Sequence, residues 1–139
     1  YFNHKYIPRA GSTASQGELN YENNFRAIRY SDVLLMAAEA NNRKTGADDA
    51  KAQNYLNQVR ARAFGNASQA STSTGATLTQ EIWDERRLEF AMEGHRFFDL
   101  VRTGEAAAKI SGFVSGKHEV FPIPQTEIDI SGLTQNPGY

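Results

Sequence analysis

Residues 28–64, IRYSDVLLMAAEANNRKTGADDAKAQNYLNQVRARAF, predict a helical hairpin. Small and apolar residues recur at helical spacing in the first half, which favours an amphipathic helix over residues 28–44. Gly46 should end this helix, because glycine readily adopts the left-handed conformation that follows a helix C-terminus. Asp48 and Asp49 then place negative charge at the start of the second helix. Alanines on the contact face let the two helices approach closely.

The chain after the hairpin predicts a loop and further helices. Residues 65–77, GNASQASTSTGAT, are polar and of low complexity, which is typical of a long surface loop. Helical spacing returns in residues 79–103, first as one helix that runs to about Met92. Gly94 lowers helix stability and predicts a break, after which residues 95–102 form a short helix.

Both ends of the chain predict irregular structure. The first 24 residues mix aromatic, polar and small side chains, so we expect an extended lead-in followed by an exposed turn. Prolines and glycines punctuate residues 104–139, and two prolines spaced by one residue favour an extended path. The predicted fold class is therefore mainly α, a helical hairpin plus further helices, with extended or irregular N-terminal and C-terminal segments.

Composition excludes several function classes. The chain has 139 residues, the size of one domain, and its net charge of -1 argues against general nucleic-acid binding. The basic stretch QVRARAF, residues 58–64, is more simply a solvated helix end. No cysteine is present, which excludes disulfide scaffolds, thiol catalysis and cysteine-based zinc sites. The chain opens at Tyr1 without a signal-peptide pattern, and we interpret it as a piece of a longer protein.

The densest group of charges is residues 85–102, ERRLEFAMEGHRFFDLVR. Glu85, Glu89 and Glu93 lie four residues apart, which would place them down one helix face. Two carboxylates about 5–9.5 Å apart across a sugar could hydrolyse a glycosidic bond. However, these glutamates share one surface, and the neighbouring arginines would keep them ionised. We therefore favour a structural network of ion pairs that fixes this helix to its neighbours.

Other catalytic or metal-binding patterns are weak. His4, His95 and His118 are far apart in the sequence, and only His95 has a possible partner, Asp99, one helical turn away. No activated nucleophile and no HExxH or calcium-loop pattern accompanies them. A partly buried histidine within the arginine–aspartate cluster is the simpler interpretation. We predict no catalytic residue, no metal site and no cofactor.

Aromatic residues are the remaining candidates for ligand contact, because sugars stack on aromatic rings. Trp83, Phe90, Phe97 and Phe98 fall on helical faces, which favours core packing. Three aromatics lie in irregular chain near the N-terminus, where a binding role is more plausible. The weak candidates for sugar contact are Tyr1, Phe2, Tyr6 and Trp83.

Five segments, in order, resemble the C-terminal region of the SusD/RagB family, from about Phe25 to Tyr139. They are RYSDVLLMAAEANNR (29–43), YLNQVRARAF (55–64), IWDERRLEFAMEGHRFFDLVRTG (82–104), FPIPQTEID (121–129) and LTQNPGY (133–139). The third segment matches the family pattern almost residue for residue. On this resemblance, residues 1–139 form the C-terminal SusD/RagB-like region of a longer protein.

The resemblance implies a fold and a function. Family members are mainly α and contain tetratricopeptide-like helix pairs, of which residues 28–64 would be one. They are outer-membrane lipoproteins on the extracellular face, anchored through an N-terminal cysteine that is not present in this chain. They bind oligosaccharides and deliver them to a TonB-dependent SusC-like transporter, and they are not enzymes. The implied partners are a glycan, that transporter and the N-terminal part of the same protein.

Two alternatives stay open. A tetratricopeptide-like protein-interaction module without direct sugar binding would use the same helices as a peptide groove. A glycosidase built on the glutamates of residues 85–93 is the least favoured. The sequence matches no ligand residue of the family and does not name the glycan. A core cut from a larger one would expose an apolar face, so we expect the isolated chain to self-associate.

Overall fold

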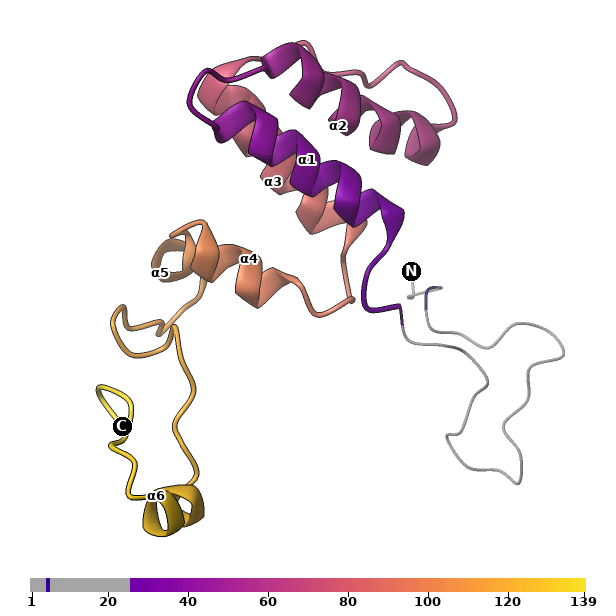
Figure 1. The fold of residues 1–139 in the computed structure, drawn as a ribbon. Coiled ribbons are helices and arrows are strands. Elements are labelled where there is room, and N and C mark those ends of the chain that lie inside the picture. The colour runs from indigo at the N-terminus through magenta and orange to yellow at the C-terminus, as the bar shows by residue number, and fades with distance from the viewer. Residues whose placement is uncertain (1–4, 6–25) are drawn as a thin grey trace, which may run out of the picture. The chain divides into compact units, whose positions relative to one another are not determined.

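The computed structural model describes Lys5 and residues 26–139, which divide into two compact units, Tyr1–Met92 and Glu93–Tyr139. The described residues form six helices and contain no strand, which confirms the predicted mainly α class. Figure 1 traces the helices in chain order. The expected N-terminal lead-in and turn, apart from Lys5, lie outside the described residues. Within the described part, no helix is both long and apolar enough to cross a membrane.

The first unit contains the predicted hairpin and one further helix. Helix α1 (Tyr30–Arg43) and α2 (Asp49–Phe64) pair with each other, and α3 (Gly75–Glu89) contacts both. Helix α1 is central, because its contacts with α2 and with α3 are both more extensive than the contact between α2 and α3 (Figure 1). The buried core residues are Leu34, Leu35, Ala38, Ala52, Leu56, Val59, Leu78, Ile82 and Phe90.

Local sequence explains the ends of the hairpin helices. The Asp48 carboxylate accepts a hydrogen bond from the backbone N–H of Lys51 at 3.0 Å, which satisfies a free donor at the start of α2. Gly46 has φ 67°, so the predicted left-handed residue after α1 is confirmed. The expected bounds of this helix, 28–44, exceed the observed ones by two residues at the start and one at the end.

The third helix begins earlier than the sequence predicts. It starts at Gly75 rather than at the predicted residue 79. The polar loop is therefore residues 65–74 rather than 65–77. Two long-range hydrogen bonds hold this start. The Gly75 N–H donates to Asp49 Oδ2 at 2.8 Å, and Asn42 Nδ2 donates to the Gly75 carbonyl at 3.1 Å. These tertiary caps come from the hairpin, so no pattern within residues 65–77 could show them.

The polar loop is attached to α2 at its middle. The Ser71 N–H donates to Asn57 Oδ1 at 2.7 Å, and Asn57 Nδ2 donates back to the Ser71 carbonyl at 3.0 Å. Ser71 is buried as a result, although most of its loop neighbours are exposed. A side-chain amide here pairs with the loop backbone as a neighbouring strand would, so the loop follows a defined path along the helix.

The second unit contains three short helices joined by irregular chain. They are α4 (Arg96–Arg102), α5 (Ala106–Lys109) and α6 (Gln125–Ser131). The break predicted at Gly94 is confirmed, with φ 82°, and α3 ends at Glu89 instead of continuing to Met92. The irregular character expected of residues 104–139 holds between helices, but α5 and α6 lie within this range.

Side-chain amides hold the last irregular segment together. Gln135 accepts from the Ile123 N–H at 2.8 Å and donates to the Ile123 carbonyl at 2.9 Å. Asn136 Nδ2 donates to the Phe121 carbonyl at 2.6 Å. The Tyr139 hydroxyl donates to the Val120 carbonyl at 3.0 Å. Residues 135–139 are thereby fixed beside residues 120–123, which positions the aromatic rings of both segments.

Candidate functional site

The glutamates of α3 are paired with arginines of α2. Arg60 Nε donates to Glu85 Oε2 at 2.9 Å, and its Nη1 donates to Glu81 Oε2 at 3.0 Å. One guanidinium therefore joins two carboxylates that lie one turn apart on α3. The predicted structural ion-pair network is confirmed for Glu85.

Glu89, the last residue of α3, accepts hydrogen bonds from two arginines. Arg29 Nη1 donates to Glu89 Oε1 at 2.7 Å, and Arg62 donates to the same oxygen. Burial raises the pKa of the Glu89 carboxyl, but the hydrogen bonds from the two arginines outweigh this effect and hold that pKa below its ordinary value of 4.5. A general acid needs a raised pKa, so this environment opposes a general-acid role for Glu89.

The third glutamate does not share the face. Helix α3 ends at Glu89, and Met92 adopts φ 68°, a left-handed conformation in which the chain leaves the helical path. Glu93 is buried in the second unit. The prediction that Glu85, Glu89 and Glu93 line one helix face is therefore wrong for Glu93, because the helix stops before reaching it.

A buried ion pair joins α1 to α3. Arg86 Nη1 donates to Asp32 Oδ1 at 2.6 Å, and the two residues are 5% and 6% exposed. The Arg86 guanidinium carbon also lies 5.0 Å from the centre of the Phe90 ring. Arg86, which belongs to the charged cluster of residues 85–102, therefore contacts the hydrophobic core through Phe90.

The histidine–aspartate pair of the second unit lies at the start of α4. His95 is the half-buried residue that precedes the helix, and its carbonyl accepts from the Asp99 N–H at 3.0 Å. The Asp99 carboxylate accepts from Arg102 Nε at 2.8 Å. Asp99 is therefore engaged in an ion pair, in agreement with an arginine–aspartate cluster.

The sequence-predicted sugar contacts do not gather into one described site. Tyr1, Phe2 and Tyr6 lie outside the described residues. Trp83 is half-buried on α3, with the Arg43 guanidinium carbon 5.5 Å from its ring centre. Its indole nitrogen is buried and makes no hydrogen bond to any described residue. A sugar could stack on that ring face only by displacing Arg43.

The core-packing prediction holds for only part of the aromatic set. Phe90 is buried in the core of the first unit. Phe97 is half-buried, and Phe98 is 64% exposed, so core packing is wrong for Phe98. The Phe98 ring meets Phe97 edge to face, with ring centres 5.7 Å apart, and stays largely in solvent.

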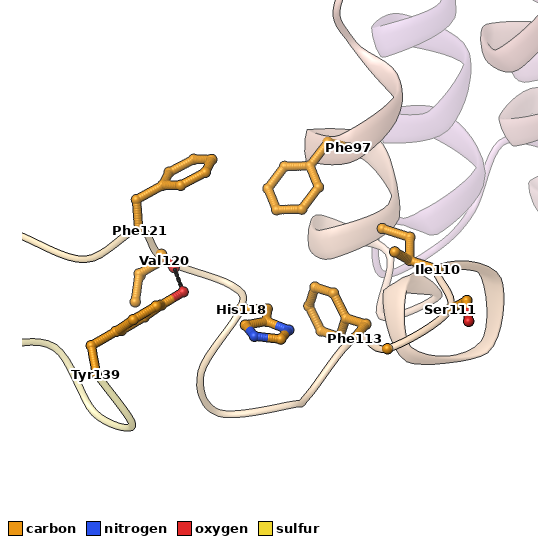
Figure 2. A pocket seen from close by; sticks show the side chains of 9 residues that line it. Phe97, Ile110, Ser111, Phe113, His118, Val120, Phe121 and Tyr139 are labelled. Atoms are coloured by element: carbon orange, nitrogen blue, oxygen red, sulfur yellow. Dashed lines mark hydrogen bonds between the residues drawn. The ribbon is translucent and has the colours of Figure 1, made fainter.

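An open hollow of about 320 Å³ lies within the second unit (Figure 2). We refer to it as the aromatic hollow, because aromatic rings form most of its wall. Its lining residues are Phe97, Ile110, Ser111, Gly112, Phe113, His118, Val120, Phe121 and Tyr139. All belong to α4 or to the irregular chain beyond it, so this site arises within one compact unit.

The rings of the aromatic hollow are held in fixed pairs. Phe97 and Phe121 have ring centres 6.0 Å apart with a 36° tilt. Phe113 meets His118 edge to face at 5.6 Å. Figure 2 shows the Phe97 and Phe113 rings on the helix side and those of Phe121 and Tyr139 across from them. The Phe97–Phe121 contact bridges these two sides, and Phe121 and Tyr139 remain 70% and 45% exposed.

His118 brings a defined polar group to this wall. The Val114 N–H donates to His118 Nδ1 at 2.9 Å. Because Nδ1 accepts this hydrogen bond, the neutral ring carries its proton on Nε2 and presents that N–H as a donor. The Ser111 hydroxyl is a second polar group of the lining. The hollow thus combines apolar ring area with a small number of hydrogen-bonding atoms, as ligand sites do.

Sequence reasoning missed this site, although a signal was available. Phe121 and Tyr139 lie in irregular chain beside prolines or glycine, the same setting that favoured the N-terminal aromatics as candidates. No group of three or more histidine or acidic residues that could hold a metal ion occurs among the described residues. The lining of the hollow offers a ligand aromatic contact and hydrogen bonds.

Comparison with known proteins places the chain in a family. The model of the SusD family matches residues 1–120. Three relatives from Formosa agariphila are similar: SusD-like protein P2 (31% identical, 97% of this chain), P25 (39%, 61% of this chain) and P38 (32%, 68% of this chain). The matches cover 30%, 16% and 20% of the lengths of those relatives. The chain belongs to the SusD family.

Proposed function

We propose that this chain is part of a cell-surface protein that binds oligosaccharides and delivers them to a TonB-dependent, SusC-like outer-membrane transporter. The observation that carries the proposal is the SusD family match over residues 1–120. On this proposal, residues 1–139 are the C-terminal region of the protein. A lipidated cysteine outside this chain anchors the whole at the extracellular face of the outer membrane.

The mechanism we propose is capture and transfer without bond cleavage. The carboxylates that could have served a hydrolase, Glu85 and Glu89, both accept hydrogen bonds from arginines. Two arginines hold the Glu89 carboxylate in ion pairs within the first unit, which supports a structural role. Capture would rest on aromatic stacking and on hydrogen bonds to sugar hydroxyls.

A glycan array tests this function. The chain and the product of its intact gene are each screened against neutral and acidic oligosaccharides, and the gene product is also tested for co-purification with a SusC-like transporter. We expect the gene product to bind at least one glycan class and to recover the transporter. Absence of binding to every glycan, together with absence of the transporter, would contradict the proposal.

One observation favours a second candidate, the tetratricopeptide-like protein-interaction module. Tyr30, Val33 and Met36 are exposed on α1 although they are apolar. Exposed apolar side chains on one helix suit contact with another polypeptide. Light scattering of the isolated chain tests whether this face contacts another polypeptide, since an apolar contact face should drive self-association that Met36→Glu abolishes. A monomer that is stable at all concentrations would remove this candidate.

A further inference from the structure

The aromatic hollow has the size and composition of a small-ligand site. Its volume of about 320 Å³ falls at the lower end of ligand pockets, which span about 300–1,000 Å³. Phe121 and Tyr139 remain 70% and 45% exposed, so their rings offer apolar area to whatever enters. Exposed aromatic area of this kind is costly in water and marks binding surfaces.

The lining selects for an uncharged ligand. It contains no acidic, lysine or arginine side chain, and its polar groups are those of Ser111, His118 and the backbone. The nearby cation, Lys117, lies with its ammonium 4.6 Å from the Tyr139 ring centre and is engaged there. An ionised ligand would lose its hydration without gaining a partner of opposite charge from the wall.

The hollow is also preorganised. The side chains of Gln135 and Asn136 hold the backbone of Ile123 and Phe121 through hydrogen bonds of 2.6–2.9 Å. The hydroxyl of Tyr139 is held by Val120, and His118 is held by Val114. Rings that are already positioned lose little conformational freedom when a ligand binds.

We propose that the aromatic hollow binds a single neutral pyranose unit of an oligosaccharide. The Phe121 ring and the face of the Tyr139 ring opposite Lys117 contact the C–H face of the sugar, and His118 Nε2–H donates to one of its hydroxyls. This inference rests on the proposed glycan-binding function and assigns a sugar subsite to residues 97–139. A pyranose suits the site because it combines an apolar face with a rim of uncharged hydroxyls.

Two variants test the two kinds of contact. Phe121→Ala removes a mostly exposed ring and keeps the backbone carbonyl that Asn136 holds. His118→Asn keeps an acceptor close to the position of Nδ1 for the Val114 N–H and removes Nε2. Ile130→Ala is the matched control, because this α6 side chain is 81% exposed and lies outside the lining.

The assay is a nuclear magnetic resonance titration of the chain with neutral probes, namely maltohexaose, cellohexaose, laminarihexaose, xylohexaose and mannohexaose, and with trigalacturonate as the acidic comparison. We expect one or more neutral probes to shift backbone resonances of residues 97, 111–113, 118–121 and 139. Phe121→Ala should raise the Kd about tenfold and His118→Asn about three- to tenfold. Ile130→Ala should leave the Kd unchanged.

Three outcomes overturn the subsite. They are no shift with any neutral probe, shifts with trigalacturonate alone, and shifts confined to the first unit. The same variants introduced into the intact gene product separate this inference from the proposed function. If that protein binds a glycan with the same Kd with and without Phe121→Ala, the function stands and the subsite fails. If it binds no glycan, both fail.

Discussion

The buried pair between Asp32 and Arg86 makes a quantitative prediction for Asp32→Asn. The two groups are 2.6 Å apart and 5–6% exposed, so the variant removes the charge of the Asp32 carboxylate from beside the buried Arg86 guanidinium. Removing one partner of a buried pair costs about 3–5 kcal/mol. The asparagine oxygen can still accept a neutral hydrogen bond, worth about 1 kcal/mol. We therefore expect the free energy of unfolding to fall by about 2–4 kcal/mol.

The assay is urea unfolding followed by the fluorescence of Trp83. This is the only tryptophan of the chain, and it lies on α3 three positions before Arg86, so it reports the first unit. With a denaturant slope of about 2 kcal/mol per molar urea, the midpoint should fall by about 1–2 M. Asp84→Asn is the control, because this α3 aspartate is exposed, and we expect a change within about 0.5 kcal/mol.

A double variant refines the test. Asp32→Leu with Arg86→Met replaces both charges by apolar side chains, which is often neutral or stabilising at buried pairs. We expect the double variant to recover most of the stability that Asp32→Asn loses. The reasoning is refuted if Asp32→Asn shifts the midpoint no more than Asp84→Asn. A double variant less stable than either single replacement would also refute it.

Three other predictions follow from the contacts. Glu89→Gln should lower the free energy of unfolding by about 1–3 kcal/mol at pH 7. Because the folded pKa of Glu89 is lowered, that stabilisation is present above pH 4.5 and disappears as the pH falls through the folded pKa. The urea midpoints of the two proteins should therefore converge as the pH is lowered below 4.5, and a constant gap would exclude this mechanism. Asn57→Ala should lower the free energy of unfolding by about 1–3 kcal/mol and speed proteolysis within the polar loop. Asn54→Ala, at an exposed position of the same helix, should do neither. Equal cleavage rates would show that the Asn57 amide does not hold the loop. Gln135→Ala should lower the hydrogen-exchange protection of the Ile123 N–H, whereas replacement of the exposed Gln125 by alanine should not. Unchanged protection of the Ile123 N–H would show that Gln135 does not anchor this segment.

Residues 28–64 were predictable because every signal in them is local. Helical periodicity, the aspartate at the start of α2 and the glycine after α1 act within a few residues along the chain. The mainly α class and the family resemblance follow from the same segments. Arginine partners for Glu85 and Glu89 were also foreseeable, because charges of opposite sign alternate in the sequence.

The identity of the partners was not foreseeable. Asp32 and Arg86 are 54 positions apart, and only the crossing of α1 and α3 brings them to 2.6 Å. The start of α3 at Gly75 depends on Asn42 and Asp49, which reach it from the hairpin. Glu93 does not share a helix face with Glu85 and Glu89, because α3 ends at Glu89 and the backbone turns at Met92.

The sequence by itself therefore determined the helical class, the hairpin, its caps and the membership in a family, because these depend on spacing along the chain. Only the tertiary structure decided where the aromatic hollow lies. Phe97, Phe113, His118, Phe121 and Tyr139 have no common spacing. The amides of residues 135 and 136, paired with the backbone of residues 121 and 123, bring the C-terminal rings to the others. A site built from such long-range hydrogen bonds exists only once the chain has folded.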